Sequence, residues 1–140
     1  GLPTGLRHHA PQGMIHLDTC LVVALLRRTD ARHAAARALL AGRGPFGCSA
    51  VAWMELHSKP LHPTDRAALA AILNAGVFPF DEACAALAGE LFHETGAKRR
   101  TRLDCMIAAT AIQADAELAT VNPDDFRSFV PRGLRLHPLP

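Results

Sequence analysis

Three apolar stretches of this sequence each carry a single carboxylate, and the chain can bury them only in a fold that gives those charges a partner. Asp18 separates two apolar runs, Glu55 follows the run at 51–54, and Asp104 precedes the run at 105–112. A charge that enters a hydrophobic core is unfavourable unless it is paired, hydrogen-bonded or bound to a metal ion. The repeated pattern therefore indicates that the three acids share one cation.

Short apolar runs alternate with helical segments along the chain, and this alternation predicts the fold class. We expect strands at 14–17, 45–48, 77–80, 117–121 and 134–136, and helices at 19–28, 31–41, 50–59, 63–74, 82–94 and 104–114. A turn with a short helical start follows at 122–126. Strands that alternate with helices form a mainly parallel sheet, so we predict a three-layer α/β/α fold with four to five strands.

The size and composition of the chain fit one globular domain. Its 140 residues are 49% hydrophobic and 20% charged, which argues against a disordered or fibrous protein. The apolar run at 20–26 is too short to cross a bilayer and no leader pattern opens the sequence, so we expect a cytoplasmic protein without membrane association. We expect residues 1–13 to form a flexible N-terminal tail and residues 14–140 to form the single domain.

The cysteines and histidines do not indicate a zinc site or a disulfide framework. The four cysteines, Cys20, Cys48, Cys84 and Cys105, are widely spaced and three of them lie inside apolar runs. The histidines lack the paired spacing of zinc ligands. We expect the cysteines to be core thiols.

The acids also have structural explanations, which must be weighed against a shared site. Asp18 and Asp125 could cap helices or turns, Asp104 could be favoured by a helix dipole, and Glu55 could extend to solvent. In an α/β fold, however, Asp18 would lie at the carboxyl end of a strand, where such sheets bind ligands. The helix-borne acids could converge there.

Carboxylates that converge would raise one another's pKa and favour a bound cation. Mg²⁺ and Mn²⁺ prefer carboxylate oxygens, and either ion can activate water and neutralise charge on a phosphodiester. Lys98, Arg99, Arg100 and Arg102 lie just ahead of Asp104 and could hold a phosphate backbone beside the acids. Considered alone, such a charge run more often forms a solvated loop.

Four segments resemble, in the same order, the acidic blocks of the PIN-domain ribonucleases, and most nearly those of the VapC-type toxins of toxin–antitoxin modules. They are 15–19 (IHLDT), 52–56 (AWMEL), 103–111 (LDCMIAATA) and 120–126 (TVNPDDF). No single block is specific, whereas the ordered set is. The similarity covers residues 14–138.

The resemblance implies roles for particular residues. Asp18, Glu55 and Asp104 match the catalytic metal-binding acids, and Asp125 matches the fourth, more variable acid. Two further residues, Thr19 and Asn122, match supporting polar positions. Lys98, Arg99, Arg100 and Arg102 would then bind RNA.

The resemblance also implies an activity and partners. It implies an endoribonuclease that depends on Mg²⁺ or Mn²⁺, cleaves RNA and forms a homodimer. It further implies a cognate antitoxin protein whose C-terminal segment wraps the toxin and obstructs its site.

Two departures from the family pattern support an alternative. Cys20 stands where the family commonly has Asn, and Lys59-Pro60 stands where a Gly is common. A catalytically weak PIN-fold module that binds RNA or an antitoxin would keep the fold and use the acids for structure. A phosphotransfer enzyme with Asp18 as the acceptor is a minor third class, because no acid follows two residues after Asp18.

Overall fold

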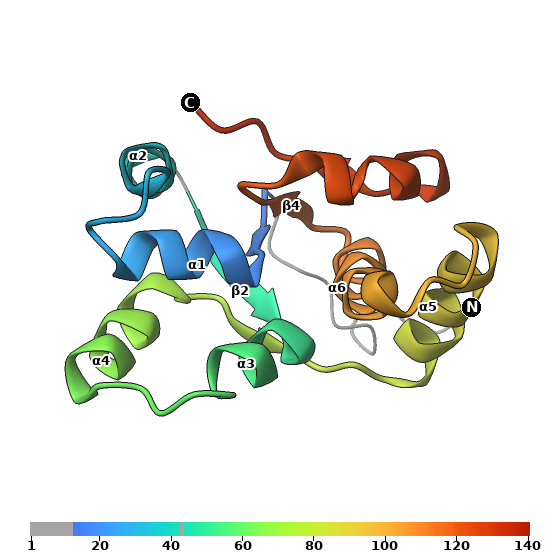
Figure 1. The fold of residues 1–140 in the computed structure, drawn as a ribbon, viewed down its shortest axis with the longest axis horizontal. Coiled ribbons are helices and arrows are strands. Elements are labelled where there is room, and N and C mark those ends of the chain that lie inside the picture. The colour runs from blue at the N-terminus through green and yellow to red at the C-terminus, as the bar shows by residue number, and fades with distance from the viewer. Residues whose placement is uncertain (1–12, 43) are drawn as a thin grey trace.

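A five-stranded parallel sheet forms the centre of the computed structural model, which describes residues 13–42 and 44–140 (Figure 1). The strand order is β3-β2-β1-β4-β5, and the strands are β1 (Ile15–Leu17), β2 (Phe46–Ser49), β3 (Gly76–Phe78), β4 (Glu117–Ala119) and β5 (Arg135–Leu136). All neighbouring pairs are parallel. The predicted α/β class with a parallel sheet of four to five strands is confirmed.

Helices connect the strands and cover the sheet. They are α1 (Thr19–Leu26), α2 (His33–Ala41), α3 (Ala50–Leu56), α4 (Pro63–Ile72), α5 (Glu82–Glu94) and α6 (Arg102–Gln113), with 3-10 turns η2 (Arg99–Thr101), η3 (Pro123–Asp125) and η4 (Arg127–Arg132). Figure 1 shows α1, α2 and α4 on one side of the strands and α5 and α6 on the other. From β1 to β3 the chain adds each new strand toward one edge of the sheet, and it then crosses to the other side of β1 to form β4 and β5. Right-handed crossover connections of this kind place helices on both faces of the sheet.

The core lies around β1, the central strand. Leu17 is fully buried, and Leu21 and Val22 of α1 pack in the same cluster. On α6, Ala108 and Ala109 are also fully buried. Their small side chains let this helix lie close to the sheet, where it packs against β4 and β2.

Several element boundaries differ from the predicted ones for identifiable reasons. The strand expected to reach Phe80 ends at Phe78, because Pro79 has no N–H to continue a ladder. Helix α3 ends at Leu56, three residues earlier than expected, since Pro60 disfavours helical backbone before it. The turn η4 was not predicted.

The predicted tail at 1–13 lies outside the described residues except for Gly13. The tail and the single-domain boundary at 14–140 therefore stay predictions. In the described part of the chain, no helix has both the length and the apolar character that a membrane crossing needs.

Candidate functional site

Asp18 lies at the carboxyl end of β1 and caps helix α1. Its side chain is 6% exposed. Thr19 N donates to Oδ1 at 2.8 Å, while Cys20 Sγ and Thr120 Oγ1 each donate to Oδ2 at 2.9 Å. Burial raises the pKa of Asp18, although these hydrogen bonds act in the opposite direction. The acid is therefore held in one orientation by three donors.

Thr120 is a site residue that the sequence-based prediction missed. It follows β4, is buried, and accepts a hydrogen bond from Asn122 N at 3.1 Å while donating to Asp18. Its position near the carboxyl end of the strand predicted at 117–121 was the available signal, because ligands of such sheets bind at that end. Thr120 links the fourth acidic segment to the first acid.

Glu55 reaches the same edge from helix α3. Thr19 Oγ1 donates to Glu55 Oε1 at 2.9 Å, which joins the start of α1 to α3. Burial raises the pKa of the half-buried Glu55, and the nearby Asp18 charge raises it further. Thr19 therefore makes a contact of the kind expected for a supporting residue.

Asp104 lies in the first turn of α6 and faces the other acids. Burial, together with the charges of Asp18, Asp125 and Glu55, raises its pKa to about 7. Like charges act in this way only when they are near one another. The structure thus brings the four predicted acids, distant in sequence, to one edge of the sheet.

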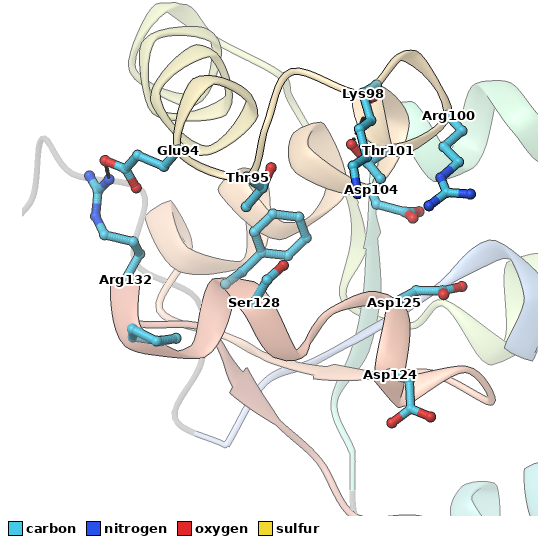
Figure 2. A pocket seen from close by; sticks show the side chains of 12 residues that line it. Glu94, Thr95, Lys98, Arg100, Thr101, Asp104, Asp124, Asp125, Ser128 and Arg132 are labelled. Atoms are coloured by element: carbon cyan, nitrogen blue, oxygen red, sulfur yellow. Dashed lines mark hydrogen bonds and ion pairs between the residues drawn. The ribbon is translucent and has the colours of Figure 1, made fainter.

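A cavity of about 770 Å³ opens beside Asp104 and Asp125. Figure 2 shows these two acids on facing walls, with Lys98 and Arg100 close to Asp104. At the far end, Arg132 is bound by glutamates of α5. The cavity therefore has a cationic side next to the acids.

The four residues of the predicted basic segment separate into two groups. Lys98 and Arg100 line the cavity, whereas Arg99 and Arg102 do not. The Arg102 guanidinium lies 5.6 Å from the centre of the Phe92 ring, which is a cation–π contact with α5. Only half of the segment is placed to meet a ligand at the acids.

Asn122 contacts the site through its backbone rather than as expected from its side chain. Its N–H donates to Thr120, while Oδ1 accepts from Arg32 Nη1 at 3.4 Å. Arg32 was not predicted, since it comes from the loop before α2 and nothing in its sequence context marks it. The side chain of Asn122 thus joins this loop to the acidic edge.

The donor chemistry of the edge fits a hard divalent cation. Carboxylate oxygens are the ligands that Mg²⁺ and Mn²⁺ prefer. Burial, and after it the neighbouring charges, raise the pKa values of Glu55 and Asp104, and a bound cation would offset both effects. Among the described residues, no group of three or more His, Cys, Asp or Glu side chains is arranged to hold a metal ion. The acids therefore share an edge without forming a closed coordination shell.

Comparisons with known proteins agree with this architecture. A family model described as the PIN domain matches residues 15–129. The structure of FitAcB from Neisseria gonorrhoeae is similar, with 25% identity, a TM-score of 0.67, and coverage of 89% of this chain and 97% of that chain. A toxin–antitoxin complex from Klebsiella pneumoniae has 26% identity, a TM-score of 0.62, and coverage of 81% and 90%.

A third solved structure supports the fold alone. VapC20 from Mycobacterium tuberculosis, described as a toxin that cleaves the sarcin–ricin loop, has 22% identity and a TM-score of 0.65. The similarity covers 89% of this chain and 99% of that chain. A search of curated proteins found no match.

Proposed function

The chain belongs to the PIN-domain family, and from this membership we propose that it is a metal-dependent endoribonuclease that acts as the toxin of a toxin–antitoxin pair. The observation that carries the proposal is the convergence of four carboxylates beside Lys98 and Arg100. An acidic edge with cations next to it suits a substrate that carries phosphates and a bound cation together.

Each acid has a defined part in the proposed reaction. Asp18, Glu55, Asp104 and Asp125 would hold Mg²⁺ or Mn²⁺, which when bound lowers the pKa of a water and neutralises phosphodiester charge. The remaining contacts keep the acids in place, since Thr19 holds Glu55 and Thr120 holds Asp18.

Lys98 and Arg100 would bind the RNA backbone next to the scissile bond. Both line the cavity that contains Asp104 and Asp125. RNA as the substrate class rests on the resemblance of the four acidic segments to the PIN-domain ribonucleases, and VapC20 is a protein of this fold that is described as cleaving the sarcin–ricin loop. Arg99 and Arg102 would contribute only through their long-range charge.

RNA cleavage by the antitoxin-free protein tests the function. With Mn²⁺ present, Asp18→Asn and Asp104→Asn should each slow cleavage by at least about 100-fold, beyond the roughly 10–100-fold cost of losing a residue that supports a metal ligand. Glu82→Gln, an exposed acid at the start of α5, serves as the matched control and should cleave like the wild type. Equal cleavage by all four proteins would rule out the proposed site.

We also propose where an antitoxin binds. A cavity of about 610 Å³ is lined partly by apolar side chains, among them Val23, Met54 and Leu103, and partly by polar ones, which include Glu55. Met54 and Leu103 are both exposed, so two large apolar side chains face solvent in the same cavity. An antitoxin segment seated there would cover Glu55, and the similar structure from Klebsiella pneumoniae, described as a toxin–antitoxin complex, supports an antitoxin as the partner.

The partner proposals have direct tests. Met54→Asp should weaken the complex with the antitoxin at least about tenfold, because it places a charge in an apolar contact.

The proposed homodimer should show twice the 15.0 kDa chain mass by light scattering. A stable monomer with full activity would contradict it.

The alternative is a catalytically weak binding module, and one observation favours it. The described acids do not form a closed metal-binding group. Mn²⁺ titration monitored by thermal unfolding separates the two: the enzyme should gain about 2–3 kcal/mol at a concentration about 100-fold above Kd, and Asp104→Asn should lose most of this gain. A binding module should show little response in either protein.

A further inference from the structure

A cationic side chain lies at the acidic edge on an element separate from Lys98 and Arg100. Arg32 directly precedes α2, and its Nη1 donates to Asn122 Oδ1. Asn122 N in turn donates to Thr120 Oγ1, which donates to Asp18 Oδ2. The Arg32 charge is also close enough to Cys20 to interact with it electrostatically. Arg32 is therefore next to the residues that hold the first acid.

Asp30 fixes the direction of the Arg32 guanidinium. Its Oδ1 accepts from Arg32 Nε at 3.1 Å and from the Arg32 backbone N at 2.8 Å, and its Oδ2 accepts from Nη2 at 3.3 Å. The Asp30 side chain is 15% exposed and that of Arg32 is 43% exposed. A planar guanidinium bound along one edge loses less entropy when its other edge meets a ligand.

The hydrogen bonds leave donors for a ligand. A guanidinium has five N–H groups, of which Asp30 uses two and Asn122 uses one. The two that remain are on Nη1 and Nη2, the pair that binds phosphate in a bidentate manner. The contact with Asn122, at 3.4 Å, is long for a hydrogen bond and can be exchanged for a stronger acceptor.

Building on the proposed ribonuclease function, we propose that Arg32 is a second phosphate-binding residue of the RNA site. It holds a backbone phosphate outside the cavity that contains Lys98 and Arg100, because Arg32 is not part of that cavity's lining. The RNA backbone then lies over the acids between cations from two different loops, and these contacts determine which phosphodiester bond lies at the acids.

The test is the binding of a labelled single-stranded RNA in EDTA, where no metal-dependent cleavage occurs, measured by fluorescence anisotropy over a range of salt concentrations. Arg32→Gln should raise Kd about 5–10-fold and reduce the slope of log Kd against log salt by about 0.7, the value for one phosphate contact on a single strand. Arg28→Gln, an exposed arginine of the same loop, is the matched control and should change neither quantity.

Arg32→Lys separates phosphate binding from a role in fastening the loop. Lysine cannot make the two-pronged contact with Asp30 but keeps the charge, so it should retain the wild-type salt slope while Kd rises less than for Arg32→Gln. An unchanged slope in Arg32→Gln, or the same reduced slope in Arg32→Lys, would overturn the proposal. If the wild type neither binds RNA nor cleaves it with Mn²⁺, the ribonuclease function fails, and the role of Arg32 fails with it.

Discussion

The fold surrounds the buried carboxylate of Asp18 with donors, which offset part of the cost of burying its charge. A backbone N–H, a thiol and a hydroxyl donate to it, from Thr19, Cys20 and Thr120. Burial and the neighbouring Asp18 raise the pKa of Cys20 to about 11, so the thiol keeps its proton and stays a donor. The cysteine that stands where relatives commonly have Asn thus still supplies a hydrogen bond to the acid.

Removing the Thr120 hydroxyl should destabilise the protein. Thr120→Val keeps the shape but deprives buried Asp18 Oδ2 of a donor and Asn122 N of its acceptor, so the free energy of unfolding should fall by about 1–3 kcal/mol. Thr110→Val is the control, because that buried hydroxyl donates only to the Met106 carbonyl of its own helix. Equal losses in urea denaturation would contradict a special role for Thr120.

Asp104→Asn should stabilise the metal-free protein at high pH. The pKa of Asp104 is raised from 3.8 to about 7, so the folded state binds its proton more tightly and stability falls as pH rises through that window. At about pH 8 the variant should gain about 1–2 kcal/mol, a figure reduced for solvent screening of this half-buried group. Near pH 4 the gain should vanish; a gain independent of pH in EDTA would refute the repulsion.

At the scale of the element, helices position three of the four acids. Asp18 caps α1, Asp104 lies in the first turn of α6, and Glu55 lies near the end of the short helix α3. Helix α3 begins at the cap Ser49, which is 1% exposed and accepts from Ala52 N at 2.9 Å. The position of Glu55 therefore depends on a cap at the opposite end of its helix.

Ser49→Ala should loosen α3 and with it Glu55. Loss of an N-cap side chain costs about 1 kcal/mol, within a range of roughly 0.5–2. The rate of RNA cleavage should fall by more than the increase in unfolded protein accounts for, because the helix that carries Glu55 then frays. Ser58→Ala is the comparison. Ser58 is exposed and lies after the end of α3, where its hydroxyl donates to the Glu55 carbonyl. Identical activity and unfolding midpoints for Ser49→Ala and the wild type would exclude this coupling.

At the scale of the whole molecule, the central strand contains a buried histidine. His16 on β1 is 1% exposed, and its ring centre lies 4.8 Å from that of Phe78. In the part of the chain that the structure describes, neither ring nitrogen has a hydrogen-bond partner. Burial lowers the pKa of His16 from 6.5 to about 4, so the folded protein contains the neutral ring.

This histidine should make the fold sensitive to acid. Between pH 6.5 and about 4 the unfolded chain binds the His16 proton and the folded chain does not, so stability is complete above that window and falls as pH decreases through it. The loss should reach about 3 kcal/mol. His16→Leu should remove this component, as shown by urea denaturation across the range. Parallel curves for the two proteins would contradict the assignment.

The fold class and the identity of the acids were predictable from local patterns. Alternating strand and helix periodicities indicated a parallel sheet, and lone carboxylates in apolar runs marked Asp18, Glu55 and Asp104. A single carboxylate within an apolar run is informative because a charge in a core segment needs a partner whatever the surrounding fold. Helix ends were predicted less well, since caps and prolines act over only one or two residues.

The sequence by itself determined which segments become strands and helices and which acids must be accommodated. Only the tertiary structure decided what surrounds those acids. Thr120 contacts Asp18 across 102 positions, and Arg32 contacts Asn122 across 90. Lys98 and Arg100, but not Arg99 and Arg102, line the cavity, and this also depends on how the loop is placed opposite η3. Such contacts arise from the order of the strands and the path of the crossovers, which no local periodicity encodes.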